Sequence, residues 1–241
     1  MKFRHYNRLI YYKFNLKFVL LAVVIGLISV FFVKVVELAY RVFLYLEPIL
    51  GWWLVVYVPS VMLLIVFLLR RFFPEAEGSG IPQALAISQL NESKINSLFA
   101  LRSIFSKVLL IFLGTLSGGT LGREGATVQI GATVMNQLGR KLSLPRRRVM
   151  LIVGAAAGLA SAFNTPLGGI VFAFEELIKS QRSHIGLLKI TAIAVSGIVT
   201  IYFLGNYSYF GRVERDLLFF NDWIFLMAII IGVIAGLISV A

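Results

Sequence analysis

Gly122-Arg123-Glu124-Gly125-Ala126 lies in the middle of a long apolar stretch of this 241-residue chain. No residue from Val108 to Gly122 is charged, and the sequence continues apolar after the Arg-Glu pair. A charge at the depth of a lipid bilayer costs several kcal/mol unless it pairs or faces a polar cavity, so such residues usually mark functional sites. Glu124 is therefore the first candidate for a functional side chain.

The composition around this stretch predicts an integral membrane protein. The chain is 59% hydrophobic and 14% charged, and its mean hydropathy of +0.89 is far above that of a typical soluble domain. Several charge-free windows are each about long enough to cross the ~30 Å hydrocarbon layer. They are Pro48–Leu69, Val149–Phe174, Ile190–Gly211 and Trp223–Ala241, with a fifth, Phe18–Val33, that continues through Lys34 and Glu37. We expect an all-α, multi-span bundle of tilted and broken helices.

The net charge of +12 comes mostly from basic clusters at the ends of these windows. This pattern is typical of the positive-inside rule and places the N-terminus in the cytoplasm. Residues 1–15 are basic and aromatic, which predicts a cytoplasmic or interfacial helix ahead of a transmembrane region over 16–241. Nucleic-acid binding is the alternative use of such charge, but the membrane pattern is favoured, so we expect a lipid bilayer and no nucleic acid as partner.

Chemistry based on cysteine, histidine or metal is disfavoured. The chain has no cysteine, and its two histidines, His5 and His184, lie in polar flanks. Disulfides, thiolate metal sites and cysteine nucleophiles are thus excluded. We expect no metal, no cofactor and no enzymatic activity. No cleavable signal peptide is expected either, and the compact start favours a bacterial inner membrane.

Glycine and proline interrupt the apolar sequence at three places, Pro74–Pro82, Gly118–Gly122 and Asn164–Pro166. The expected helices cover about 16–45, 52–71, 84–92, 98–117, 125–142, 147–161, 166–179, 187–204 and 221–240. Asn164 or Thr165 is expected to cap the helix that Pro166 begins. Irregular backbone at membrane depth persists only where protein buries it or where it lines a cavity. The breaks therefore indicate a site inside the protein.

Two of these breaks carry the features of an anion site. The first turn of a helix presents unpaired N–H groups and the positive end of its dipole, so two converging helix starts bind an anion without a full positive charge. The run at 78–82, Gly-Ser-Gly-Ile-Pro, offers amides and a hydroxyl, and the run at 122–125, Gly-Arg-Glu-Gly, offers amides with a carboxylate attached. The expected anion-binding residues are Ser79, Gly80, Ile81, Arg123 and Gly125.

Three segments, in this order and spacing, resemble the CLC family of chloride channels and chloride/proton exchangers. They are Gly78-Ser79-Gly80-Ile81-Pro82, Gly122-Arg123-Glu124-Gly125, and the stretch from Gly154-Ala155-Ala156-Ala157-Gly158 through Asn164-Thr165-Pro166-Leu167 to Glu175-Glu176. The resemblance covers essentially the whole chain. It implies one half of an inverted-repeat fold, with chloride and protons as partners and a homodimer whose interface includes helices within 166–204.

The resemblance also implies roles for three residues. Ser79 helps to bind the central chloride, Glu124 is the external gating glutamate, and Glu176 is the internal proton-transfer glutamate of the exchangers. Physically, an ionised glutamate at a helix start competes with the anion for the same amides and releases them when it is protonated, which couples the two ions. The predicted function is proton-coupled chloride antiport.

Other interpretations of the same residues stay open. A structural ion pair with Arg123 is the alternative for Glu124, and an ordinary helix-end cluster with Glu175 and Lys179 is the alternative for Glu176. Ser79 is also compatible with a plain helix cap. The glycines at 154, 158, 168 and 169 are more typical of tight helix packing than of ion binding.

Two departures from the family pattern affect the prediction. Ala126 stands where the family motif usually has proline, and the third anion-site motif, Gly-x-Phe-x-Pro, and a central tyrosine are missing. Because the chain ends in an apolar run at Ala241, we expect a truncated record of a longer protein rather than a natural half that needs a partner. We expect the 241 residues alone not to conduct.

Three further functions remain as alternatives. A passive, voltage-gated-type chloride channel has the same architecture, but in the family it often lacks the inner glutamate that Glu176 matches. A truncated, non-conducting fragment or a membrane-embedded enzyme is the second. A fluoride-selective variant is the third, although the serine at 79 fits the chloride-type motif better.

Overall fold

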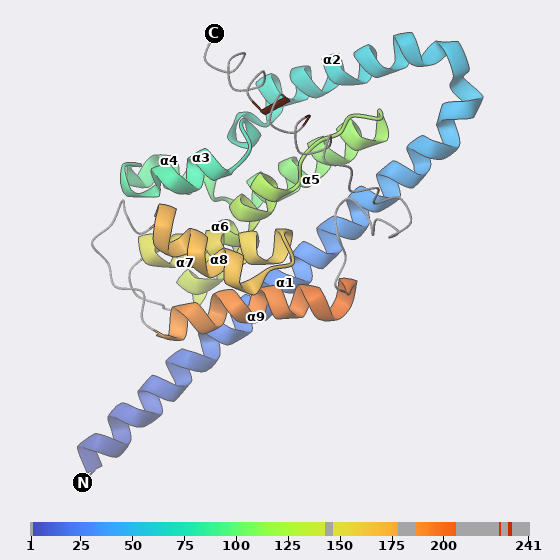
Figure 1. Ribbon diagram of the computed structural model, residues 1–241. Helices are drawn as coiled ribbons and strands as arrows, with labels where there is room; N and C mark the ends of the chain where they lie inside the picture. The colour runs from blue at the N-terminus through green and yellow to red at the C-terminus, as the bar shows by residue number, and fades with distance from the viewer. Residues whose placement is uncertain (1, 143–146, 178–186, 206–226, 228–230, 233–241) are drawn as a thin grey trace. The chain divides into compact units, whose positions relative to one another are not determined.

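The structure is a computed structural model that describes residues 2–142, 147–177, 187–205, 227 and 231–232, with the side chains of 2–15, 176–177 and 188 outside that description. The chain forms two compact units, Met1–Asn206 and Tyr207–Ala241. All that follows concerns the first unit (Figure 1). The helix predicted over 221–240 falls almost entirely outside the described residues.

Helices make up all the regular structure of the described residues, and no strand occurs among them, so the all-α prediction is confirmed. The α-helices are α1 (Lys2–Leu50), α2 (Leu54–Phe72), α3 (Ile81–Leu85), α4 (Glu92–Leu98), α5 (Leu101–Leu116), α6 (Glu124–Lys141), α7 (Arg147–Ala162), α8 (Pro166–Phe172) and α9 (Leu187–Leu204). Short 3₁₀ turns lie at Gly51–Trp53, Pro74–Ala76 and Ala86–Ser88, and a π turn at Ala173–Leu177.

The first helix is longer than the sequence suggested. α1 has 49 residues and runs without a break from the predicted interfacial segment through Pro48. At 1.5 Å per residue it is about 74 Å long, more than twice the ~30 Å apolar layer. The boundary at residue 15 therefore coincides with no break in the helix, and an interfacial location for residues 1–15 stays a prediction.

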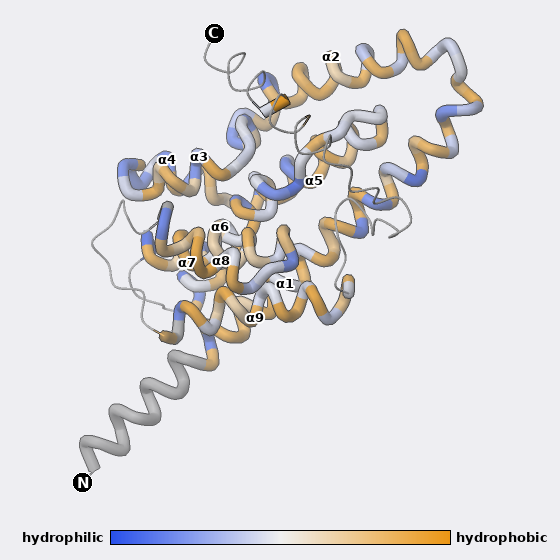
Figure 2. The backbone as a smooth tube through the Cα atoms, viewed as in Figure 1, coloured by the Kyte–Doolittle hydropathy of each residue, from blue (hydrophilic) through white to orange (hydrophobic). Residues whose placement is uncertain are grey.

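Few of the described helices are long and apolar enough to cross a bilayer by themselves. The stretch Leu16–Phe72 is long and apolar enough, and α4 with α5, bent by 43°, would make a second span. α8 and α9 are apolar but shorter. Figure 2 shows hydrophobic residues along much of α1 and α2, and large side chains such as Tyr45, Trp52, Val55 and Leu63 are exposed there. Exposed apolar faces of this kind are expected where lipid is the solvent.

α6 and α7 form the centre of the unit. Every residue of α6 from Gly125 to Asn136 is buried, as is every residue of α7 from Val149 to Ala162. The helices touch through glycine: a Cβ on Gly131 would stand 2.2 Å from the Gly154 oxygen, and a Cβ on Gly158 would stand 2.2 Å from the Thr127 oxygen. The packing role predicted for Gly154 and Gly158 is confirmed.

Gly168 and Gly169, which were also predicted to serve helix packing, differ from each other. A Cβ on Gly169 would meet Ala160 of α7 at 2.5 Å, so Gly169 also serves close helix packing. A Cβ on Gly168 would meet only the side chain of Thr165, which ends in a rotatable hydroxyl. Close packing between helices therefore explains three of the four positions.

α1 contacts the C-terminal end of α6 and the segment that precedes α6. The Lys17 ammonium donates to the Leu142 carbonyl at 3.0 Å, at the C-terminal end of α6. Further along α1, the Phe43 ring lies 2.5 Å from where a Cβ of Gly118 would be, just before the N-terminal end of α6. The cation at the negative end of the α6 dipole stabilises that helix.

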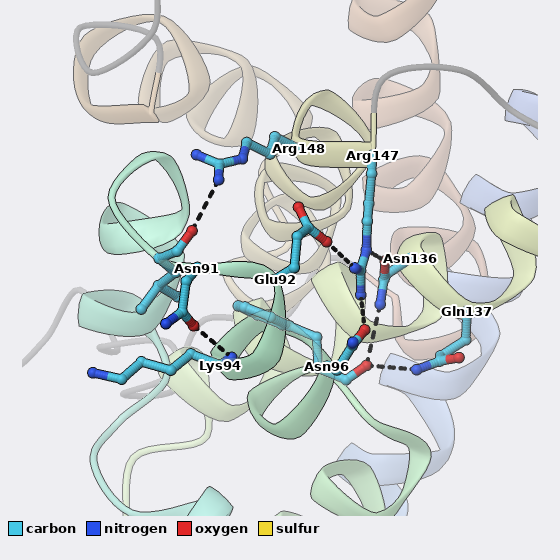
Figure 3. A network of polar contacts seen from close by, with 10 residues as sticks. Asn91, Glu92, Lys94, Asn96, Asn136, Gln137, Arg147 and Arg148 are labelled. Carbon is cyan, nitrogen blue, oxygen red and sulfur yellow. Dashed lines mark hydrogen bonds and ion pairs between the residues drawn. The ribbon is translucent and has the colours of Figure 1, made fainter.

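A polar network fastens α4 to the ends of α6 and α7 (Figure 3). Arg147 donates to Glu92, to Asn96 at 2.6 Å and to Asn136 at 2.8 Å. The next residue, Arg148, donates to the backbone oxygens of Ser88 and Leu90. Arg147 thus binds α4, and Arg148 binds the backbone just before α4. Together the two arginines hold the segment before α5 against the start of α7.

Two local predictions are wrong. The helix expected over 84–92 is instead α3, a 3₁₀ turn and a new helix, because the Asn91 side chain accepts from the Lys94 amide at 2.9 Å and caps α4. Thr165 is the residue before α8, yet its side chain makes no capping hydrogen bond. Asn164 adopts φ 57° and donates to the Gly205 oxygen at 2.8 Å. A tertiary contact to the end of α9 thus replaces the expected cap.

The glycine contacts predict that α6 and α7 cannot tolerate even one added methyl group. Gly158→Ala is expected to lower the free energy of unfolding by about 1–3 kcal/mol, because the methyl group would meet backbone atoms of α6. The measurement is the thermal unfolding of the detergent-purified protein. Gly168→Ala is the matched control, since the Thr165 hydroxyl can rotate away. Equal melting temperatures for both variants would contradict the packing role.

Candidate functional site

The two glycine-rich runs meet, although 39 residues separate them in sequence. Gly80 is the residue before α3 and has φ 111°. A Cβ on Gly80 would stand 2.1 Å from the Gly125 oxygen, and a Cβ on Gly125 would stand 2.5 Å from the Ser79 oxygen. Backbone therefore touches backbone, and the starts of α3 and α6 lie next to each other as the anion-site hypothesis requires.

Position 80 requires glycine for two reasons, its backbone conformation and its closeness to α6. The left-handed backbone conformation disfavours any side chain, and the 2.1 Å approach leaves no volume for one. Pro82 follows in the first turn of α3, where its fixed φ suits a helix start and its missing N–H is not needed. The residues of the run 78–82 thus allow a loop to end and a helix to begin in contact with α6.

Glu124 is the first residue of α6. Its side chain is half-buried, and Oε2 lies 2.7 Å from the position that a Cβ of Gly122 would occupy. The carboxylate therefore folds back over Gly122, at the end of the helix where the dipole favours negative charge. A side chain at 122 would take the space that the carboxylate fills.

The remaining residues of the predicted anion site surround this contact. Ser79 is exposed, Gly80 and Gly125 are buried, and Ile81 and Arg123 are half-buried. Arg123 precedes α6, and its carbonyl accepts from both the amide and the hydroxyl of Thr127, at 3.0 and 2.7 Å. The residues predicted to bind the anion therefore lie together at the starts of α3 and α6. Chloride binding by these residues remains a prediction.

Glu176 lies in the π turn Ala173–Leu177 that follows α8. Its side chain is outside the described part of the structure, whereas that of Glu175 is exposed. The expected helical face of Glu176 assumed α-helical spacing from Pro166. A π turn widens the helix and rotates the residues after it, and such turns are frequent at functional sites. The proton-transfer role of Glu176 therefore stays a prediction.

Lys107 belongs to a basic cluster, Arg102–Lys107, of the kind attributed above to the positive-inside pattern. Nevertheless Lys107 is only 4% exposed and donates from α5 to the Gly78 carbonyl. Gln129 of α6 is 1% exposed and donates to the Leu98 oxygen at 2.9 Å and the Glu75 oxygen at 3.4 Å. The sequence did offer one sign that Lys107 is buried, because it directly precedes the apolar stretch that begins at Val108. Nothing in the sequence singled out Gln129.

Comparison with known proteins decides the family. Residues 61–241 match the family model described as voltage gated chloride channel. The chain belongs to the voltage-gated chloride channel family. The resemblance to CLC proteins is thereby confirmed, and the fold is that of an all-helical integral membrane protein.

Curated relatives in this family include the H(+)/Cl(-) exchange transporter ClcA of Citrobacter koseri and that of Salmonella arizonae. Each is 37% identical over 163 residues, which cover 64% of this chain and 33% of the relative. The chain therefore matches about a third of the length of these two relatives.

Solved structures show the same fold. A CLC-type fluoride/proton antiporter superposes with a TM-score of 0.64 at 23% identity, over 93% of this chain and 55% of the other. A slow cyanobacterial Cl-/H+ antiporter superposes with a TM-score of 0.59 at 27% identity, over 88% of this chain and 52% of the other. The chain thus spans about half of each of these two structures, as expected for one half of the inverted-repeat fold.

The geometry of the two runs predicts different stabilities for alanine substitutions at Gly80 and at Gly122. Gly80→Ala is expected to destabilise the protein by at least about 1–3 kcal/mol, because its methyl group would overlap backbone and its φ is unfavourable. Gly122→Ala is expected to leave the melting temperature nearly unchanged and to displace the Glu124 carboxylate, which is the end of a flexible side chain. Thermal unfolding and a structure of Gly122→Ala test this. Equal destabilisation by the two variants would contradict the geometry.

Proposed function

We propose that the protein carries chloride across the membrane in exchange for protons, with Glu124 as the external gate. The observation that supports this most directly is the position of Glu124, at the first turn of α6 and beside the loop that contains Ser79. The printed names of the curated relatives, which are H(+)/Cl(-) exchange transporters, support the same ions. We propose a transporter rather than an enzyme.

The proposed coupling follows from competition for the same amides. The ionised Glu124 carboxylate and a chloride ion are both attracted to the free N–H groups and the positive dipole end at the start of α6. Protonation removes the charge of Glu124, so the carboxyl releases the amides and chloride takes its place. Each ion therefore favours the state that the other needs, which is the differential interaction that exchange requires.

A backbone anion site suits transport better than a salt bridge to the ion. A lysine or arginine side chain in direct contact would hold chloride strongly and slow its release, whereas conduction needs binding that is weak enough to reverse. In this proposal the Ser79 hydroxyl and the amides of Gly80, Ile81, Arg123 and Gly125 bind the ion. Glu176 passes protons on a second path toward the cytoplasm.

We also propose a homodimer through helices within 166–204, in a bacterial inner membrane. α8 and α9 carry exposed apolar side chains, among them Leu167 at 76%, Ile198 at 56% and Tyr202 at 82% exposure. The opposite sides of these helices pack on α7, through Gly169 of α8 and the Ser161–Ser196 hydroxyl pair at 2.8 Å. The outward faces are therefore available to a second copy.

Neutralising either glutamate is expected to abolish proton movement and to keep chloride movement. Glu124→Gln cannot be deprotonated, so chloride flux should persist while proton flux falls to the level of protein-free liposomes. Glu176→Gln should likewise remove proton flux and keep chloride flux. The measurement is simultaneous chloride and pH recording from liposomes that contain the full-length protein.

The exposed Glu47 of α1 provides the matched control. Glu47→Gln removes one carboxylate far along the chain from both sites and should leave both fluxes unchanged. Chloride flux without proton flux in the unmodified protein would overturn the exchanger and leave the passive channel. No chloride flux in the unmodified protein would overturn both.

The absence of cysteine gives a direct test of the dimer. Leu167→Cys and Tyr202→Cys each introduce a single thiol on the proposed interface, and bifunctional crosslinking in membranes should give a band of twice the protomer mass. Leu63→Cys places the thiol on the exposed face of α2 and should give none. Equal crosslinking at Leu63 and at the two interface positions would contradict the proposed surface.

A further inference from the structure

The loop that leads into α3 has its carbonyl groups held by side chains of three different helices. The Glu77 oxygen accepts from Gln83 Nε2 of α3 at 2.6 Å. The Gly78 oxygen accepts from the Lys107 ammonium of α5. The Glu75 oxygen accepts from Gln129 Nε2 of α6 at 3.4 Å. Three contacts of one kind therefore hold the segment between the 3₁₀ turn Pro74–Ala76 and α3.

These contacts fix the direction of the amides that the anion would use. In a trans peptide the carbonyl and the following N–H point to opposite sides. Because the Gly78 carbonyl points to Lys107, the N–H of Ser79 points away from Lys107. The same reasoning applies to the Glu77 carbonyl and the N–H of Gly78. The negative ends of these peptide dipoles are thus turned toward side-chain donors.

Lys107 is the strongest of the three donors. It is 4% exposed, and among the described residues no carboxylate lies within ion-pair distance of it. A buried ammonium without a partner is costly, and a hydrogen bond to a charged group is about twice as strong as a neutral one. The Gly78 carbonyl supplies that bond.

Gln129 connects the loop to the helix that carries Glu124. It lies five residues after Glu124 on α6, and its Cβ would stand 3.0 Å from a Cβ of Gly80. Its amide nitrogen donates to two carbonyls, while its Oε1 is buried without a hydrogen-bond partner among the described residues. The amide group is therefore oriented by its two donor contacts.

We propose that Lys107, Gln83 and Gln129 are positioning residues that turn the carbonyls of Glu75, Glu77 and Gly78 away from the anion path and leave the amides of Gly78 and Ser79 facing it, beside the start of α3. None of the three is assigned to touch the ion. All three act through the geometry of the loop. The inference rests on the proposed function for the identity of the ion, but the loop geometry can be measured without it.

The first measurement is hydrogen/deuterium exchange of the peptide that contains residues 78–84 in the full-length, detergent-purified protein. Lys107→Met is expected to raise amide exchange in this peptide at least about tenfold, because the loop loses a hydrogen bond from a charged group and opens more often. Lys107→Arg should restore protection. Lys17→Met is the matched control, because it removes the same charge and the same kind of bond, to the Leu142 carbonyl at the far end of α6.

The second measurement is the chloride dissociation constant of the same variants by titration calorimetry. Lys107→Met should weaken chloride binding at least about tenfold, and Gln129→Leu and Gln83→Leu should weaken it severalfold with no change in net charge. Gln83 is half-buried, so its variant keeps the test valid if Lys107→Met does not fold. Lys17→Met should bind chloride normally.

The outcomes separate the two proposals. Unchanged amide exchange in both Lys107→Met and Gln83→Leu overturns the positioning role, whatever chloride does. Raised exchange with unchanged chloride affinity also overturns it, because the loop geometry would then not matter to the ion. If the unmodified protein binds no chloride, the proposed function fails, and amide exchange still decides whether the three side chains hold the loop.

Discussion

The backbone contact between Gly80 and Gly125 is the constraint on which the site depends. It places the start of α3 against the first turn of α6 with no side chain between them. The left-handed φ of Gly80 and the proline in the first turn of α3 suit that approach, and the Glu124 carboxylate folds over Gly122 beside it. An anion site made of amides requires such closeness, because partial charges act only over short distances.

α6 can hold its N-terminus at this point because it is fixed along its whole length. Small residues let α7 approach until backbone meets backbone at Gly131 and Gly158, which is the packing that a membrane interior favours over hydrophobic association. α1 contacts its C-terminal end and the segment that precedes it, and places Lys17 at its C-terminal carbonyls. Side chains of α6 then bind the segment before α5, through Gln129, Asn136 and Gln137. A rigid helix presents Glu124 in one direction.

Two of the differences between prediction and structure share a cause, which is that a distant partner replaced a local one. Asn164 was expected to cap α8, but its side-chain amide donates to the Gly205 carbonyl instead. Lys107 was grouped with other basic residues, but it lies in the interior and donates to the Gly78 carbonyl. The helix predicted over 84–92 ended for a local reason, since Asn91 caps the new helix α4. Arg148 then holds the backbone of Ser88 and Leu90 from α7.

The sequence by itself determined the all-helical membrane class, most helix positions, the family and the candidates Ser79 and Glu124. These follow from composition, from glycine and proline as breakers, and from a charge placed where it is costly, all of which are local properties. Only the tertiary structure decided that Gly80 meets Gly125, that Glu124 lies over Gly122, and that Lys107 and Gln129 hold the neighbouring loop. The physical reason is that hydrogen bonds and close packing depend on distance in space, which the order of residues does not specify.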